Sequence, residues 1–429
     1  MKLIKAIRIV FLLAITLPAL LKAASAQLVN NGTSITITDG AVLYTGYSFT
    51  NAVNGNVINR GSIITDSSII NEQGATLSGH GIYSMQANFT NKGTYNNDSS
   101  MLEFTGALNS SIKNKGGKIY LVQIAKNENK YVNLLDNETV LNGIMFLNDK
   151  NWIKLGNHNL TLGNNCVIED YSNKRFIITN GTGILKKLNV KNAPFTFPVG
   201  FDKKTYNALT ITENGTPEDY SVRCLENALL NGSSGIPVSS KGIDASWFVE
   251  RKTEAGANAV IKAGWKTTDE LTDFDYTKCM VVRYAANKWD FKINQAGTAT
   301  GNTYRSISRS GFSSFGYFTV LSGANPGFGG MVSATGDENA FAVADDRDMQ
   351  PKVYPTIVQN NININMPVSK NGGKMNIRII DGTGKAVWQK QNADYGSQKI
   401  FLPNLAPGMY NVLIEADDTK FVQKIIIAR

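Results

Sequence analysis

Ile58-Asn59-Arg60-Gly61-Ser62-Ile63 is the first of four related stretches in the N-terminal part of the chain. The others are Ile70-Asn71-Glu72-Gln73-Gly74-Ala75, Phe89-Thr90-Asn91-Lys92-Gly93-Thr94-Tyr95 and Ile112-Lys113-Asn114-Lys115-Gly116-Gly117. Their asparagines, Asn59, Asn71, Asn91 and Asn114, are 12, 20 and 23 residues apart. Repeats of about 20 residues are typical of solenoids, in which one supersecondary unit stacks on the next. The repeat therefore predicts a right-handed β-solenoid.

Two features of such a stack follow from these residue types. Asparagine at a turn can hydrogen-bond the equivalent asparagine of the neighbouring coil, and glycine can take the positive φ that a tight corner requires. The irregular spacing leaves an alternative open, in which the same stretches are the turns of unrelated hairpins.

The whole segment 27–194 is rich in asparagine and glycine. It holds 28 asparagines in 168 residues, and both asparagine and glycine disfavour helix interiors. Short β-branched runs such as Ser34-Ile35-Thr36-Ile37-Thr38 and Arg175-Phe176-Ile177-Ile178 alternate with turn residues, which is a strand-and-turn signature. We expect a β-solenoid-like region over 27–194.

The segment 1–26 has the organisation of a secretory signal peptide. A basic start with Lys2, Lys5 and Arg8 precedes an apolar stretch over 9–21, and Ala24-Ser25-Ala26 supplies the small residues of a cleavage site. Cleavage after Ala26 would make Gln27 the mature N-terminus. The alternative is a retained membrane helix, but Pro18 and Lys22 interrupt the stretch, which is shorter than the roughly 20 residues that span a bilayer. The rest of the sequence predicts no transmembrane segment.

The charge of the chain gives little support to a nucleic-acid partner. The net charge is +9, and Lys2, Lys5, Arg8 and Lys22 account for four, which leaves +9 − 4 = +5 after cleavage. The remaining basic residues are scattered among acids without a basic run interleaved with aromatics, so we expect no nucleic-acid binding. A weak attraction to anionic cell-surface polymers stays open.

The three cysteines, Cys166, Cys224 and Cys279, are too few for a disulfide scaffold. Cys224 and Cys279 lie in strand-like contexts and could pair. We favour two small buried thiols, because free cysteine packs readily as an apolar residue.

The middle segment, 195–323, is poorer in asparagine and richer in aromatics. Strand-like patterns at short intervals, such as Ser246-Trp247-Phe248-Val249-Glu250-Arg251, predict an antiparallel β-sandwich. Trp247, Trp265 and Trp289 could line a sugar-binding face. Core packing is the preferred interpretation, because strand alternation places one side of every strand inside.

A linker is predicted over 324–350, where Asn325-Pro326-Gly327-Phe328-Gly329-Gly330 is followed by a charged stretch. Asp345, Asp346 and Asp348 lack the alternation and the turn glycine of a calcium loop. We interpret them as a solvated charge cluster and expect no metal site there.

The C-terminal segment, 351–429, predicts a small antiparallel sandwich of six or seven strands. Alternating runs appear at 362–366, 375–380, 386–388, 399–402, 409–415 and 421–427, with a turn at Asp381-Gly382-Thr383-Gly384.

These residues resemble the type A C-terminal sorting domain of the type IX secretion system of Bacteroidota. Members of that family usually begin with Tyr-Pro-Asn-Pro, pass through an Asp/Asn-Gly turn to Leu-x-x-Gly-x-Tyr, and end with Lys and an apolar strand. The matching positions are Tyr354, Pro355, Asp381, Gly384, Leu405, Gly408, Tyr410, Val412, Ile414 and Lys424. Thr356 and Ile357 stand where the family usually has Asn and Pro, so only the opening motif departs.

The resemblance implies an export route in two steps. A signal peptide would take the chain to the periplasm, and the terminal domain would be read by the outer-membrane translocon and removed by its C-terminal signal peptidase. The mature protein would be secreted or held on the outer cell surface, where surface lipopolysaccharide or an extracellular polysaccharide is a further candidate partner.

A looser resemblance covers about residues 130–320. Leu155-Gly156-Asn157-His158-Asn159-Leu160, Ile177-Ile178-Thr179-Asn180-Gly181 and Phe197-Pro198-Val199-Gly200 are similar to adhesin-like repeat proteins of the same bacteria, which have no agreed biochemical activity.

The sequence predicts no catalytic, cofactor-binding or metal-binding residues, and we expect a protein that is not an enzyme. His80 and His158 have no metal-ligand spacing, and no Gly-x-Ser-x-Gly elbow occurs. Our leading hypothesis is an adhesin-like surface or structural protein, with a carbohydrate-binding accessory protein as the alternative. A solenoid polysaccharide lyase or hydrolase would need converging carboxylates. Only Asp136 with Glu138, and Glu169 with Asp170, lie close in the asparagine-rich region.

Overall fold

The computed structural model describes residues 27–323, 352–354, 357–358, 361–366, 374–393, 396–403, 405–416 and 419–427. Its regular structure is almost entirely strand, with three short 3-10 helices. The predicted all-β class is therefore confirmed. The predicted signal peptide, including Ala26, and the predicted linker with its three aspartates lie outside the described residues.

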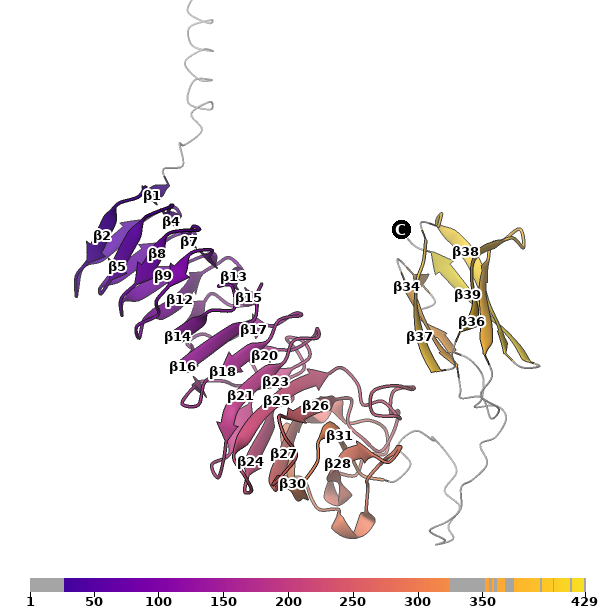
Figure 1. Cartoon of the computed structure of the whole chain (residues 1–429). Coiled ribbons are helices and arrows are strands. Elements are labelled where there is room, and N and C mark those ends of the chain that lie inside the picture. The colour runs from indigo at the N-terminus through magenta and orange to yellow at the C-terminus, as the bar shows by residue number, and fades with distance from the viewer. Residues whose placement is uncertain are drawn as a thin grey trace, which may run out of the picture. The chain divides into compact units, whose positions relative to one another are not determined.

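The N-terminal part is a β-solenoid, in which nine strands of one parallel sheet follow one another along the stack (Figure 1). They are β1 (Leu28–Asn30), β4 (Phe49–Asn51), β7 (Ile69–Asn71), β10 (Phe89–Asn91), β13 (Ser110–Lys113), β15 (Lys130–Leu134), β17 (Asn151–Lys154), β20 (Arg175–Ile178) and β23 (Val199–Gly200). Each pairs in parallel with the strand of the next coil, as Phe49 with Ile69 and Ile69 with Phe89. The predicted solenoid is confirmed.

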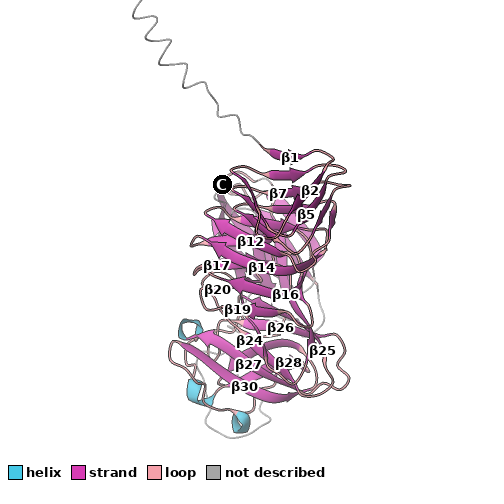
Figure 2. Cartoon of the chain, turned by 90° about the vertical axis from the view of Figure 1, so that its left-hand side faces the viewer, coloured by secondary structure: helices cyan, strands magenta, loops and turns pink. Residues whose placement is uncertain are grey.

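Two further sheets complete the coils. The shorter one consists of β2 (Ser34–Ile37), β5 (Asn56–Asn59), β8 (Thr76–Ser78) and β11 (Thr94–Tyr95). The longer one begins with eight parallel strands, several of which Figure 2 shows side by side: β3 (Val42–Thr45), β6 (Ser62–Thr65), β9 (Ile82–Met85), β12 (Met101–Gly106), β14 (Lys118–Lys126), β16 (Glu138–Phe146), β18 (Leu160–Leu162) and β21 (Leu185–Val190). A short strand, β19 (Val167–Glu169), also pairs with β16.

A ladder of buried asparagines runs through the first coils. Each side-chain amide donates to the carbonyl oxygen of the next: Asn30 Nδ2 to Asn51 Oδ1 at 2.8 Å, Asn51 to Asn71 at 2.9 Å, Asn71 to Asn91 at 2.8 Å, and Asn91 to Asn114 at 2.7 Å. These residues are 0–4% exposed, so the ladder provides acceptors for the amides of Asn30, Asn51, Asn71 and Asn91, which would otherwise be costly to bury. The predicted bonding between equivalent asparagines is confirmed.

The structure corrects the alignment of the first repeat. Asn59 ends β5 in a different sheet, and its Nδ2 donates to the carbonyl of Ile82 at 2.9 Å. The true equivalent of Asn71 is Asn51, 20 residues earlier. The 12-residue spacing was therefore a distance between two corners of one coil and not a coil length.

Glycines of the repeats act in two ways. Gly74 and Gly116 have φ of +79° and +69° and confirm the predicted left-handed corner conformation. At Gly61 a Cβ would lie 2.2 Å from the carbonyl oxygen of Ala41, and at Gly93 2.3 Å from that of Ala75. At these two positions the requirement is close approach of neighbouring coils, which leaves no room for a side chain.

Aromatic side chains take over the coil-to-coil stacking later in the solenoid. Tyr131, Trp152 and Phe176 occupy registered positions of β15, β17 and β20. Their ring centroids are 5.5 Å and 6.3 Å apart, and Phe176 continues to Tyr206 at 5.2 Å. Aromatic pairs at such distances add about 0.5–1.5 kcal/mol each beyond their buried area.

The parallel stack ends where β25 (Glu218–Leu225) pairs antiparallel with β21. β26 (Ser246–Arg251) follows β25 in the same sheet, and β22 (Phe195–Phe197), β24 (Leu209–Glu213) and β27 (Ala259–Lys266) form antiparallel pairs of a second sheet. The predicted antiparallel pairing in 195–323 is thus present.

Two compact units divide the chain. The first spans Met1–Leu225, Trp247–Lys266 and Arg309–Phe315, and the second spans Glu226–Ser246, Thr267–Ser308 and Gly316–Arg429. The segment 195–323 contributes to both units, and its outer boundaries stay predictions.

The second unit contains two separate hydrophobic clusters. One is built from Ala228, Val238, Met280, Val282, Trp289 and Leu321. Its strands are β28 (Met280–Ala285), β29 (Lys288–Trp289) and β31 (Gly316–Leu321). The same unit also holds the 3-10 helices η2 (Thr267–Asp269), η3 (Tyr276–Lys278) and η4 (Ile293–Gln295), and β30 (Tyr304–Phe312) has residues in both units.

The other cluster belongs to the C-terminal segment, which forms two sheets. One has the order β32 (Lys352–Tyr354), β34 (Asn361–Met366), β37 (Gly396–Phe401). The other has the order β33 (Ile357–Val358), β39 (Thr419–Ile427), β38 (Gly408–Ala416), β35 (Met375–Ile380), β36 (Ala386–Ala393). Apart from the parallel pair β33–β39, the pairing is antiparallel, and the predicted strands at 362–366, 375–380, 409–415 and 421–427 are present.

Replacement of Asn71 by alanine tests the ladder. Asn71 accepts from Asn51 and donates to Asn91 and to the carbonyl of Thr94, so Asn71→Ala removes buried hydrogen bonds to the coils on both sides. We expect a loss of about 2–4 kcal/mol in the free energy of unfolding, measured by urea titration with circular dichroism. Asn56→Ala is the control, because Asn56 is only partly buried and its amide bonds Ser34 Oγ at 3.3 Å. The control should change stability by less than about 0.5 kcal/mol, and equal effects would contradict a stabilising ladder.

Candidate functional site

The C-terminal segment has a core of its own. Ile377 and Ile379 of β35, Val412 and Ile414 of β38, and Ile425 of β39 are 0–1% exposed and pack in one cluster. The alternation of β38, in which Tyr410, Val412 and Ile414 are buried and Met409 is exposed, places the apolar positions of the sequence pattern on the inner face. The segment therefore has the core of an independent β-sandwich.

The turn at Asp381 is held by its own carboxylate. Asp381 Oδ1 accepts from the backbone N–H of Thr383 at 2.9 Å, from Thr383 Oγ1 at 2.6 Å and from the backbone N–H of Lys385 at 3.0 Å. The hydrogen bond from the Thr383 hydroxyl is the main reason why the pKa of Asp381 lies below its usual range. Gly384 has φ of +87°, which explains glycine at that position.

The second part of the motif connects to β38. Leu405 is partly buried against the core, and Tyr410 is 8% exposed with its hydroxyl donating to the carbonyl of Ala406 at 2.9 Å. Gly408 begins β38 with φ of +155°, while Lys424 is an exposed residue of β39. Tyr354 ends β32, and Pro355 lies outside the described residues.

Residues 352–428 match the family model of the secretion system C-terminal sorting domain. The chain is a cargo protein of the type IX secretion system. No curated protein matches it.

The sorting domain determines where this cargo protein goes. It is handled by the type IX secretion machinery and exported to the cell surface or secreted. Within the described residues, no helix combines the length and the apolar composition needed to cross a membrane. Removal of the domain by the C-terminal signal peptidase, cleavage between Ala26 and Gln27, and the role of each motif residue stay predictions.

The tryptophans of the middle segment are core residues. Trp247 and Trp265 are fully buried and Trp289 is 8% exposed. Trp247 Nε1 donates to the carbonyl of Asn207 at 2.7 Å and Trp289 Nε1 to that of Leu229 at 3.1 Å. The core interpretation is confirmed, and the sugar-binding face is wrong because these rings contribute no exposed surface to stack on a sugar.

The histidines and acid pairs do not converge. His80 Nε2 lies 3.0 Å from Asp39 Oδ1 at an exposed site, and His158 lies in a turn. Asp136 Oδ2 accepts from the backbone N–H of Lys115 at 3.1 Å at an exposed site, whereas the Glu138 side chain is buried. Glu169 is exposed at the end of β19, and Asp170 follows it with φ of +56°. Among the described residues, no group of three or more His, Cys, Asp or Glu side chains could hold a metal ion.

Cys166, Cys224 and Cys279 are free and buried. Burial raises the pKa of Cys166 and of Cys279 to about 12. The preferred interpretation as small buried thiols is confirmed, and the alternative pairing of Cys224 with Cys279 is wrong.

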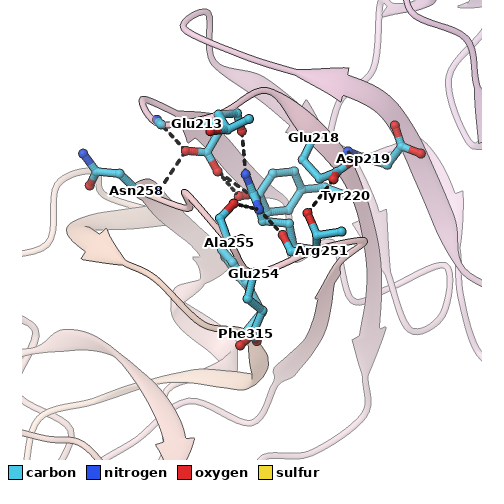
Figure 3. A network of polar contacts seen from close by, with 12 residues as sticks. Glu213, Glu218, Asp219, Tyr220, Arg251, Glu254, Ala255, Asn258 and Phe315 are labelled. Atoms are coloured by element: carbon cyan, nitrogen blue, oxygen red, sulfur yellow. Dashed lines mark hydrogen bonds and ion pairs between the residues drawn. The ribbon is translucent and has the colours of Figure 1, made fainter.

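A buried ion pair lies at the antiparallel end of the first unit and was not predicted from the sequence (Figure 3). Arg251 Nε donates to Glu213 Oε2 at 3.0 Å, and both side chains are fully buried. Tyr220 Oη donates to the same oxygen at 2.6 Å, while the backbone N–H groups of Gly215 and Asn258 donate to Oε1 at 2.6 and 2.9 Å. Burial alone would raise the pKa of Glu213, but the hydrogen bonds and the Arg251 charge hold it below its usual range.

The rest of the Arg251 guanidinium is satisfied by backbone carbonyls. Nη2 donates to Thr216 at 2.5 Å, and Nη1 donates to Thr253 and, at 3.2 Å, to Ala255. These partners come from the loops that follow β24 and β26. The buried pair therefore holds the loops after β24 and β26 in place at the end of the stack, which is a structural role.

Two buried lysines connect neighbouring coils. Lys126 Nζ donates to the carbonyls of Gln86, at 3.1 Å, and Thr105, and burial lowers the pKa of Lys126 to about 8. Lys187 Nζ donates to the carbonyls of Gly163 at 2.7 Å and Asn164 at 2.8 Å. A lysine in a strand pattern gave no signal of this role.

Substitution of Arg251 tests the buried pair. Arg251→Met leaves the Glu213 carboxylate buried without its cation, and we expect a loss of about 3–5 kcal/mol in unfolding free energy. The double variant Glu213→Gln/Arg251→Met removes the uncompensated charge but keeps an acceptor for Tyr220, Gly215 and Asn258, so it should recover part of that loss. Lys174→Met removes the exposed pair of Lys174 with Asp149 at 3.1 Å and should cost at most about 1 kcal/mol. Equal losses for Arg251→Met and Lys174→Met in urea titrations would contradict a special role for the buried pair.

Glu138 provides a pH-dependent prediction. Its Oε1 accepts from the backbone N–H of Asn114 at 2.9 Å, and burial raises its pKa to about 8. Since the unfolded pKa is about 4.3, the folded state retains this proton across the intervening window. The contribution of Glu138 to stability is therefore complete below about pH 4.3 and is lost as the pH rises to about 8.

Glu138→Gln removes this titration. The stability of the variant relative to the parent should rise with pH over the same window, by at most about 1.4 kcal/mol per pH unit because one proton is involved. Urea titrations at several pH values would measure the difference, and parallel curves for the two proteins would show that Glu138 does not titrate in this way.

Proposed function

We propose that the exported part of this protein is a non-enzymatic, adhesin-like structural module, which the sorting domain delivers to the cell surface or the medium. The observation that supports this most is the asparagine ladder over Asn30, Asn51, Asn71, Asn91 and Asn114. It commits these five buried side chains to hydrogen bonds between coils. Such internal satisfaction rigidifies a stack and suits a rod that presents a surface at a distance from its point of attachment.

The outer surface of the solenoid adds to this interpretation. Lys92 pairs with Glu72 at 3.0 Å, Lys150 with Glu128 at 2.6 Å and Lys174 with Asp149 at 3.1 Å, and each pair joins neighbouring coils. Exposed pairs contribute at most about 1 kcal/mol each. Their charges are directed at one another along the stack, which fits a scaffold better than a groove of converging catalytic groups.

Attachment of cells tests the proposal. A bacterium that makes the protein should lose attachment to its natural surface, or cell–cell aggregation, when the chain is deleted, and added purified full-length protein should restore or competitively block it. The matched control is a strain in which the sorting domain alone is deleted, because that strain makes the passenger without exporting it.

An enzyme assay supplies the opposite outcome. The purified protein is incubated with neutral and acidic polysaccharides, and new reducing or unsaturated sugar ends are measured. Sustained release that scales with protein concentration would overturn a non-enzymatic role. Unchanged attachment of the deletion strain would overturn the adhesin-like role while leaving export intact.

A further inference from the structure

The outer face of the five-stranded sheet of the sorting domain carries an unusual set of exposed side chains. In the register of β38 with β39, Met409 lies opposite Ile426, Asn411 opposite Lys424, and Leu413 opposite Val422. Met409, Val422 and Ile426 are 61%, 59% and 44% exposed. Three large apolar side chains on one face of a small secreted sheet are what a binding surface presents.

A lysine lies between the two apolar pairs. Lys424 is exposed, and within the described part of the chain its ammonium takes part in no hydrogen bond or ion pair. The neighbouring charges are already paired: Glu415 binds Arg378 at 2.5 Å and Lys420 at 3.0 Å. At one end of the outer face, Glu415, Arg378 and Lys420 therefore neutralise one another. Toward the other end, Lys424 lies among apolar side chains without a described partner.

The opposite face of the same sheet is not accessible to a partner. Tyr410, Val412 and Ile414 of β38 and Ile425 and Ile427 of β39 form the core of the domain. Alternation along these two strands thus sends the motif's apolar positions inward for folding and leaves Met409, Val422, Lys424 and Ile426 outward. These outward positions make no contribution to the core, so stability alone does not account for their apolar character.

We propose that this outer face, Met409, Leu413, Val422, Lys424 and Ile426, is the surface by which a protein of the export machinery binds the sorting domain. The proposal rests on the export function of the domain and adds which surface is read. The partner that fits is a protein with an apolar patch and a carboxylate positioned to pair with Lys424. An ion pair between Lys424 and this carboxylate would be shielded from water by the apolar pairs on both sides. It would therefore be stronger than an ion pair in water, and it would give specificity.

Two outward variants test the face in the full chain, made in a bacterium with this secretion system. Met409→Thr/Val422→Thr removes apolar area while keeping strand-compatible residues, and Lys424→Gln removes the cation. We expect the exported fraction to fall about tenfold or more for each, since one well-placed anchor contributes about that factor, with full-length chain accumulating in the periplasm.

The controls are matched to each variant. Phe401→Thr removes an apolar side chain that is 70% exposed on β37 of the other sheet, and Lys385→Gln removes an exposed lysine at the Asp381 turn. Both should be exported like the parent. Thermal melting of the purified chains should be the same for all variants. If the double variant melts earlier, it is replaced by the single variants Met409→Thr and Val422→Thr.

Deletion of 352–428 separates this proposal from the sorting function itself. If the deletion blocks export and the outer-face variants are exported like the parent, the proposed surface is wrong and the sorting function stands. If the deletion leaves export unchanged, the sorting function fails as well. Loss of export in the control variants to the same degree would also overturn the proposal, because the effect would not belong to this face.

Discussion

The first coils of the solenoid depend on one interaction: an asparagine buried between coils donates its side-chain amide to the equivalent asparagine of the next coil. Asn51 and Asn71 donate along the stack while accepting from the coil before. An unpaired amide in this position would cost about 1–3 kcal/mol, so a shift in register by one residue would orphan the whole row. The ladder thus fixes register as well as stability, and the hydrophobic positions Phe49, Ile69 and Phe89 stack in the same alignment.

The asparagine ladder ends at Asn114, and other kinds of side chain connect the later coils. The backbone N–H of Asn114 donates to the carboxyl of Glu138. In the later coils the rings of Tyr131, Trp152 and Phe176 form a second row, in register with one another but at a different position of the coil. In the longer sheet the pairing changes from parallel to antiparallel between β21 and β25, and the buried Glu213–Arg251 pair lies at that end. Buried charges are costly unless all their hydrogen-bonding groups are met, and the guanidinium and carboxylate there obtain partners from several loops. The stack is therefore closed by a fully bonded polar centre.

In the sorting domain, side chains alternate between the inner and the outer face of each strand. Its inner residues give a small domain a core of its own, while its outer residues remain available to the secretion machinery. Because the domain has a core of its own, the passenger and the address can vary independently. The domain can then export passengers with unrelated tasks, which is why the match to this family defines the route of the chain and leaves the activity of its passenger to other evidence.

Local sequence patterns were sufficient to predict the all-β class, the solenoid and hydrogen bonding between equivalent asparagines, and the resemblance of the C-terminal motif was sufficient to predict the sorting domain. These features depend on local periodicity and on turn residues such as Asp381 and Gly384. The sequence could not align Asn59 correctly, since corners of one coil and equivalent corners of two coils share the same residue types. It also gave no sign of Glu213 with Arg251, of Lys126, or of the row from Tyr131 to Phe176. These contacts join residues of different coils or strands, up to 40 positions apart for Lys126 and Gln86. Only the stacking of the coils brings them together, because burial and partnership belong to the tertiary structure and not to the local pattern.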